Sequence, residues 1–281
     1  MGSRMRTVKP RINLEVIGRV DDSVVSHVLK VLRDFYERLE PDIIPEMVDV
    51  QVFARRNIML GFLSSALEGV EAVYPFDEAY TAMHEAWSGI PKIYVCAEDF
   101  ERLPRNVFNA ALQHEAAHSV LHGSPEYYVI NIPASLVTEF RRRGFTDEEV
   151  SHLAYLGASA LKDLEASKLL ERLGYVEDQV AFILHNLKME ASDLAAWAAA
   201  SLNSKMSLIY LVHMLKALAA STPLLKSKHG EELANKRRRA CSHLNSKHTQ
   251  ILQSLEEALE KAEGDFNEKM VSLLRAVLSS F

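Results

Sequence analysis

The sequence predicts an α+β protein, with a small mixed sheet and its helices first and an all-helical region after them. Apolar residues alternate along three short segments before residue 100, which is typical of strands. A helix that is apolar on almost every side follows these segments, and such a helix belongs in the interior of a domain. From Val176 onward every segment has helical periodicity. We therefore expect an N-terminal arm or tag at 1–10, a mixed domain at 11–175 and an all-helical domain at 176–281.

The expected strands of the first hundred residues are 11–20, 47–54 and 91–96. We take the last of them for an edge strand that would bind an extended peptide by strand addition. A helix is expected from Ser23, with Asp21 and Asp22 offering a cap, and Pro41 ends it. Residues 57–75 are ambiguous, and residues 76–87 are expected to form a short helix in an insertion.

The helices of the second half have clear boundaries in the sequence. Thr146 and Glu149 have the spacing of a capping box, and Gly174 closes the helix that they begin. Arg141, Arg142 and Arg143 fill the last turn of the helix before it, where cations suit the helix dipole. The remaining helices are expected at about 176–189, 191–202, 204–221, 230–244, 247–262 and 266–280.

Composition narrows the classes of function. Of the 281 residues, 48% are hydrophobic and 25% are charged, which is ordinary for a globular protein. The net charge of −6 gives no overall electrostatic preference for nucleic acid or for an anionic membrane, so we expect neither as a partner. The basic run at 236–239 is interpreted as a solvated helix face. Cys96 and Cys241 form no disulfide framework, and no segment is apolar and long enough to span a bilayer, so a cytoplasmic protein is expected.

The segment His114-Glu115-Ala116-Ala117-His118 fits the pattern H-E-x-x-H, on a helix expected to run from about Asn106 to Gly123. Residues four apart lie on one face of a helix, so both imidazoles can bind the same Zn²⁺ ion. Such an ion lowers the pKa of bound water, and Glu115 is placed to accept the proton. The competing interpretation is a buried helix whose histidines are satisfied by the core. It is less favoured, because burying these groups without compensation is costly.

His122 continues the four-residue spacing of the two histidines but is not expected to bind the ion. It lies roughly 12 Å along the helix axis from His114, so it cannot share one ion with both other histidines on an unbroken helix. We expect His122 to contact the last carbonyl groups of the helix or to lie at the rim of the cleft.

The HEAAH helix, preceded by the short strand PKIYVC and followed by an acidic helix, resembles the zincin metallopeptidases, and most of all the minimal gluzincin type. The resemblance covers residues 11–174. In that type the third metal ligand is acidic and lies on the downstream helix, followed by two residues, Ala, and a small polar or acidic residue. The segment from Asp163 to Ser167 has this shape, with Asp where Glu is commoner and Ser where Asp is commoner. The resemblance therefore implies a zincin-like domain.

The implied Zn²⁺ ligands are His114, His118 and Asp163, with Glu165 as the alternative third ligand. We favour Asp163 because its helix face carries small and apolar neighbours, whereas Glu165 can pair with Lys162 or Lys168 in solvent.

A peptidase of this kind also needs a hydrogen-bond donor at the developing oxyanion. Four residues are candidates by their proximity in sequence to the two helices: Tyr127, Tyr128, His152 and Tyr155.

The expected function is a zinc-dependent metallopeptidase that cleaves a peptide or protein substrate, with Glu115 as its general base. The alternative is a metal-binding protein of the zincin fold without peptidase activity, acting as a protein–protein interaction or regulatory module. In either case the helical half, residues 176–281, could form the interface with other copies of the chain in an oligomer or with a protein partner.

Overall fold

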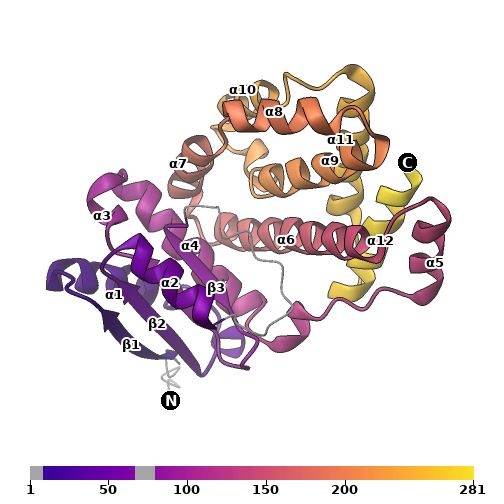
Figure 1. Cartoon of the computed structure of the whole chain (residues 1–281). Helices are drawn as coiled ribbons and strands as arrows, with labels where there is room; N and C mark the ends of the chain where they lie inside the picture. Colours follow the sequence, from indigo (N-terminus) through magenta and orange to yellow (C-terminus); the bar gives the residue numbers. More distant parts are fainter. Residues whose placement is uncertain (1–8, 67–79) are drawn as a thin grey trace, which may run out of the picture. The chain divides into compact units, whose positions relative to one another are not determined.

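The computed structural model describes residues 9–66 and 80–281 and shows an α+β protein (Figure 1). A four-stranded mixed sheet with its helices comes first in the chain, and a largely helical region follows. The described residues form two compact units, one of residues 9–66, 80–128 and 169–182 and the other of residues 129–168 and 183–281. Among the described residues, no helix is both long and apolar enough to cross a membrane.

The first unit is built on a sheet with the strand order β1-β2-β4-β3. Strands β1 (Arg11–Ile17), β2 (Met47–Phe53) and β4 (Lys92–Cys96) are parallel, and β3 (Ala82–Glu85) pairs with β4 in the antiparallel sense. The register places Leu14, Val50, Ile93 and His84 in one row across the sheet. Because side chains alternate between the faces of a sheet, His84 shares its face with the buried Val50 and Ile93.

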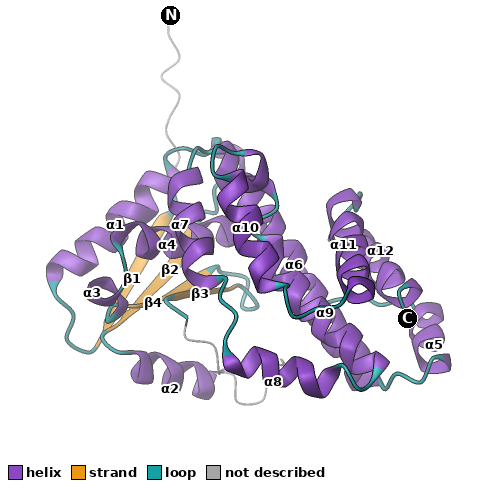
Figure 2. Ribbon diagram, turned by 90° about the horizontal axis from the view of Figure 1, so that it is seen from above, coloured by secondary structure: helices purple, strands orange, loops and turns teal. Residues whose placement is uncertain are grey.

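Helices cover both faces of this sheet. Figure 2 shows α1 (Asp22–Tyr36) and α4 (Arg105–Leu121) on one side of the strands and α2 (Arg56–Ala66) on the other. The cluster beside α2 consists of Met59 and Leu63 from that helix and the buried residues Phe53, Met83, Tyr94 and Cys96. The opposite face, which carries the His84 row, therefore belongs to α1 and α4.

Two predictions for this region are wrong. Residues 82–85 form strand β3, whereas a short helix was expected at 76–87, of which 76–79 lie outside the described residues. Strand β4 pairs with β2 and with β3, so it is an interior strand and cannot accept another strand. Local alternation does not distinguish interior strands from edge strands, because pairing partners come from distant parts of the chain. The ambiguous segment begins with helix α2, and its residues 67–75 lie outside the described residues.

The second unit is helical, and every helix expected after residue 176 is present, several of them ending a few residues earlier than expected. The first of them, α7 (Val176–Asn186), contributes its residues up to Phe182 to the first unit. The remaining helices are α5 (Ala134–Arg142), α6 (Asp147–Arg172), α8 (Ala191–Ala200), α9 (Ser204–Ala219), α10 (Gly230–Ala240), α11 (Ser246–Lys261) and α12 (Phe266–Ser279).

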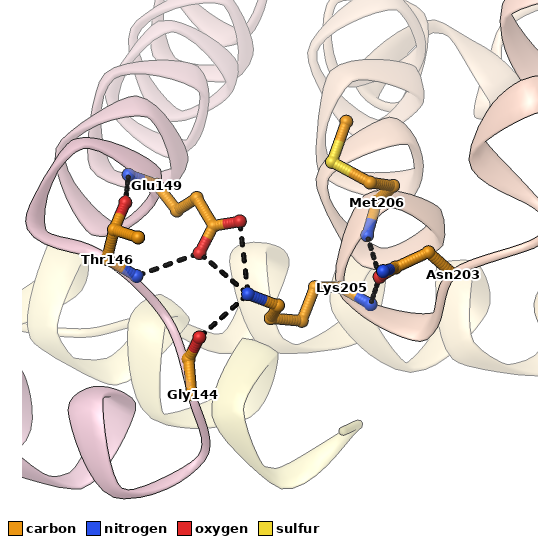
Figure 3. Close-up of polar contacts among 6 residues, drawn as sticks. All are labelled: Gly144, Thr146, Glu149, Asn203, Lys205 and Met206. Atoms are coloured by element: carbon orange, nitrogen blue, oxygen red, sulfur yellow. Dashed lines mark hydrogen bonds and ion pairs between the residues drawn. The ribbon is translucent and has the colours of Figure 1, made fainter.

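The start of α6 confirms the expected capping box (Figure 3). The backbone N–H of Thr146 donates to Glu149 Oε2 at 2.8 Å, and the N–H of Glu149 donates to Thr146 Oγ1 at 3.2 Å. Lys205, in the first turn of α9, donates from Nζ to the same Glu149 Oε2 at 3.2 Å and to the Gly144 carbonyl at 2.7 Å. Gly174 has a φ of 81°, the left-handed conformation expected of a glycine that ends a helix.

Gly123 follows the helix of the H-E-x-x-H motif, and close packing requires a glycine there. A Cβ atom at this position would lie 2.2 Å from the carbonyl oxygen of Ser119 and 3.0 Å from Cγ of Pro91. Both distances are too short, so any side chain would push the end of α4 away from the start of β4. Gly61, on the exposed side of α2, offers the opposite case, since a Cβ atom there would meet nothing within 4 Å.

We predict that Gly123→Ala lowers the free energy of unfolding by about 1–3 kcal/mol, the usual effect of overpacking. Gly61→Ala is the matched control and should raise that energy by roughly 0.5–1 kcal/mol, because alanine favours the helix more than glycine does. Urea denaturation followed by circular dichroism measures both. A Gly123→Ala protein as stable as the wild type would show that α4 and β4 do not need this close approach.

Candidate metal centre

Helix α4 is buried along almost its whole length, as its sequence predicts. Its buried residues include the apolar Val107, Phe108 and Leu112, and they also include polar residues. The polar ones are Gln113, His114, His118 and Ser119, and His122 caps the C-terminal end. A buried polar side chain is normally hydrogen-bonded or bound to a metal ion, so these residues mark the site.

The two histidines of the motif point their Nε2 atoms at the same place. Side chains at i and i+4 lie one above the other on a helix, and the Nε2 atoms of His114 and His118 are 3.1 Å apart. Their rings are nearly perpendicular, at 81°, and both are buried, with 7% and 8% of each residue exposed. Phe182 of α7 stacks on the ring of His114 at 5.9 Å and limits its orientation.

Asp163 of α6 completes a group of three possible metal ligands. One ligand atom from each of His114, His118 and Asp163 lies within 4.8 Å of the other two. Within residues 9–66 and 80–281, this is the group of histidine, cysteine and acidic side chains that could hold a metal ion. Two imidazole nitrogens and one carboxylate oxygen are a common donor set for transition metals.

Glu165, the alternative third ligand, has a partner of its own. Its Oε1 atom accepts a hydrogen bond from Lys269 of α12 at 2.6 Å, in an ion pair about three-quarters buried. Glu165 was expected to pair in solvent with Lys162 or Lys168, whereas this ion pair is with Lys269 and is largely buried. Ser167, at the position where the resemblance favours an acidic residue, is buried and donates to the carbonyl oxygen of Ala220 at 2.6 Å.

Glu115, the expected general base, lies between the two histidines in sequence and is half-buried on α4. A residue that directly follows the first histidine is turned about 100° around the helix from it. Glu115 is absent from the group of possible ligands among the described residues.

One of the two positions expected for His122 was the rim of a cleft, and this expectation is wrong. His122 is completely buried, with 0% of the residue exposed, and its Nδ1 atom lies 3.0 Å from Nδ1 of His118. The ring of Tyr127 meets the ring of His122 edge to face at 5.1 Å. As expected, His122 is absent from the group of possible ligands among the described residues.

Of the four expected oxyanion donors, Tyr127 contacts His122, and Tyr128 contacts a histidine that stacks on His118. The Tyr128 hydroxyl lies 3.3 Å from Nδ1 of His84, whose ring stacks on that of His118 at 6.0 Å with an angle of 14° between the rings. His152 and Tyr155 lie on α6, roughly 16 Å and 12 Å along the helix axis from Asp163 by the helix rise. Burial lowers the pKa of His152.

The sequence did not single out His84. It lies in a four-residue strand within a segment expected to be helical, so its side of the sheet could not be assigned. In the structure it shares the β3 face that is turned toward α4, beside His118.

No protein-family model, curated protein or solved structure matches this chain. The class of protein is therefore defined by the fold and the site alone. It is an α+β protein with a candidate metal-binding site of two histidines and one aspartate.

We predict that the purified chain binds about one transition-metal ion, and that His114→Ala or His118→Ala abolishes this binding. Asp163→Ala should weaken binding strongly. Glu165→Ala is the matched control, one acidic residue further along the same helix, and should leave the affinity unchanged. Metal analysis by mass spectrometry and competition with a coloured chelator measure the effects. Weaker binding by Glu165→Ala than by Asp163→Ala would reverse the assignment of the third ligand.

Proposed function

We propose that this protein is a zinc-dependent metallopeptidase of the zincin class. One observation carries the proposal, the convergence of His114 Nε2, His118 Nε2 and a ligand atom of Asp163 beside a helix that also carries Glu115. The cluster adds Asp163 to the two histidines of the H-E-x-x-H pattern, and the pattern, read from adjacent residues, does not itself contain this third possible ligand.

The donor set fits Zn²⁺. Nitrogen atoms bound to one tetrahedral zinc ion at about 2.0–2.1 Å lie about 3.3 Å apart, close to the 3.1 Å between the two Nε2 atoms. Three protein ligands leave a further coordination position for water, as in catalytic rather than structural zinc sites. Zinc held in this way acidifies water and polarises a carbonyl group.

The protein's own groups would then move the proton and hold the substrate. The Glu115 carboxylate would accept a proton from the attacking water and deliver it to the nitrogen of the leaving amine. Tyr128, which His84 holds by a hydrogen bond at 3.3 Å, would donate its hydroxyl hydrogen to the carbonyl oxygen of the scissile bond as negative charge develops there.

Strand β3 is the part of the sheet that would bind an extended substrate. It lies beyond β4 in the sheet order, and among the described residues no strand pairs with its other side. A partly buried network holds its start: Arg56 forms an ion pair with Asp99 and donates to the Tyr80 carbonyl at 2.7 Å, and Thr81 donates to Asp99 at 2.9 Å. A peptide paired with this firmly held edge would pass His84, and so run beside the candidate metal centre.

A metal-binding protein without peptidase activity, acting as an interaction or regulatory module, is the second candidate function. The observation that favours it is a set of three exposed apolar side chains on α8, just after it and at the start of α9. Leu194, Leu202 and Met206 are 48%, 88% and 45% exposed.

We propose the cytoplasm as the compartment of this protein, because Cys96 and Cys241 are both free thiols.

Glu115→Gln separates these two functions. It should keep the metal content of the wild type and reduce hydrolysis of an unstructured, fluorescently labelled protein by at least about 100-fold, the scale of a lost general base. Glu165→Gln makes the same chemical change next to the third ligand and should remain active. A wild-type protein that holds zinc yet cleaves nothing in a broad peptide library would favour the interaction module.

Tyr128→Phe tests the oxyanion donor. Loss of one such donor typically lowers kcat by about 10²–10³ with little change in metal binding, and we expect an effect of this size. Tyr155→Phe serves as the comparison, because Tyr155 lies on α6 away from Asp163, and it should retain kcat. Steady-state kinetics on a peptide cleaved by the wild type gives both values. If Tyr155→Phe lost kcat and Tyr128→Phe kept it, the donor would be assigned to α6.

A further inference from the structure

The ring of His122 contacts the ring of His118 through a nitrogen atom, although His122 is not itself a metal ligand. It lies one turn beyond His118 at the C-terminal cap of α4, where its backbone N–H donates to the His118 carbonyl at 2.7 Å. Its ring is fully buried, and its Nδ1 atom lies 3.0 Å from His118 Nδ1, a hydrogen-bond distance. His118 is thus held on both sides, by His122 at Nδ1 and by His114 at Nε2.

This contact has two possible arrangements of hydrogen atoms. A neutral imidazole carries one hydrogen, so of two Nδ1 atoms in contact one donates and the other accepts. If His122 donates, His118 carries its hydrogen on Nε2 and gives it to His114 Nε2, which leaves His118 without a lone pair for a metal ion. If His118 donates, its Nε2 keeps a free lone pair directed toward the place where the ion would lie.

We infer that His122 is the hydrogen-bond acceptor that holds His118 in its metal-binding tautomer. The inference rests on the metal site proposed above and adds a third histidine to it, as a positioning residue and not as a ligand. Metal-binding histidines generally donate their second ring N–H to an acceptor, and that acceptor is usually a carboxylate, a carbonyl oxygen or water. Here the acceptor is the imidazole of His122.

An imidazole acceptor suits the buried position of residue 122 better than a charged carboxylate would. His122 is completely buried, and a carboxylate at its position would need compensation for the loss of hydration. Each of the three histidines carries one hydrogen in both arrangements, so the change from the metal-free to the metal-binding arrangement shifts hydrogens between ring nitrogens and creates no charge. Tyr127, whose ring closes on His122 at 5.1 Å, holds the acceptor ring in place.

The test compares the zinc affinity of three variants of the full chain. His122→Phe keeps a ring but removes the acceptor, and should weaken binding by about 10–100-fold, as is usual when such a partner is lost. His122→Asn returns an acceptor oxygen near the position of Nδ1 and should restore most of that loss. His27→Phe is the matched control: His27 contacts Asn109 of the same helix at 2.7 Å and is absent from the group of possible ligands, so its loss should leave the affinity unchanged.

A second measurement does not depend on the folding of variants. In the zinc-loaded wild type, nitrogen chemical shifts of the histidine rings should show the hydrogen on Nδ1 of His118 and on Nε2 of His122. Zinc binding by His122→Phe as tight as by the wild type, or a hydrogen on Nδ1 of His122 in the loaded protein, would overturn the inference and leave the metal site standing. A wild type that binds no zinc would overturn both together.

Discussion

The burial of polar side chains on helix α4 is the constraint on which the rest of the first unit depends. Gln113, His114, His118, Ser119 and His122 are all buried on this one helix or at its cap. Each buried polar group left without a hydrogen bond costs about 1–3 kcal/mol, and the net stability of a typical domain is only about 5–15 kcal/mol. The helix can therefore occupy the interior only if its neighbours, or an ion, satisfy these groups.

The neighbouring elements satisfy the two polar residues that are not histidines. Gln113 donates to Asp178 of α7 at 2.8 Å, and Gln179 of the same helix donates to the Ala110 carbonyl at 3.2 Å. On α1, the hydroxyl of Tyr36 lies 2.7 Å from that of Ser119, and burial raises the pKa of Tyr36, so it stays protonated. These contacts fix α4 against α1 and α7, and the two motif histidines are held by a helix that cannot easily rotate.

The parts of this structure that local sequence determines could be predicted, and the parts that depend on distant pairing could not. The buried helix with its H-E-x-x-H motif and the capping box at Thr146 follow from adjacent residues, and both are present. The helix expected at 76–87 and the edge position of β4 were wrong, because strand order depends on partners far away in the chain. His84 was missed for the same reason, because it needs the antiparallel pairing of β3. The contact of His122 with His118 is local, and it depends on the non-helical cap conformation of His122, with φ −132° and ψ 28°.

The burial of three histidines does not by itself require a metal ion, since the rings could satisfy one another through the two contacts of 3.0 and 3.1 Å. Asp163 changes this argument. Its carboxylate brings a ligand atom within 4.8 Å of both imidazoles and adds negative charge to the cluster. Two imidazole nitrogens and a carboxylate oxygen are a common donor set for a transition metal, whose positive charge would suit this carboxylate. Glu165, two residues away, forms an ion pair with Lys269 of α12 and is absent from the group of possible ligands. A metal ion at the proposed site would bind ligand atoms that the three side chains already bring within 4.8 Å of one another.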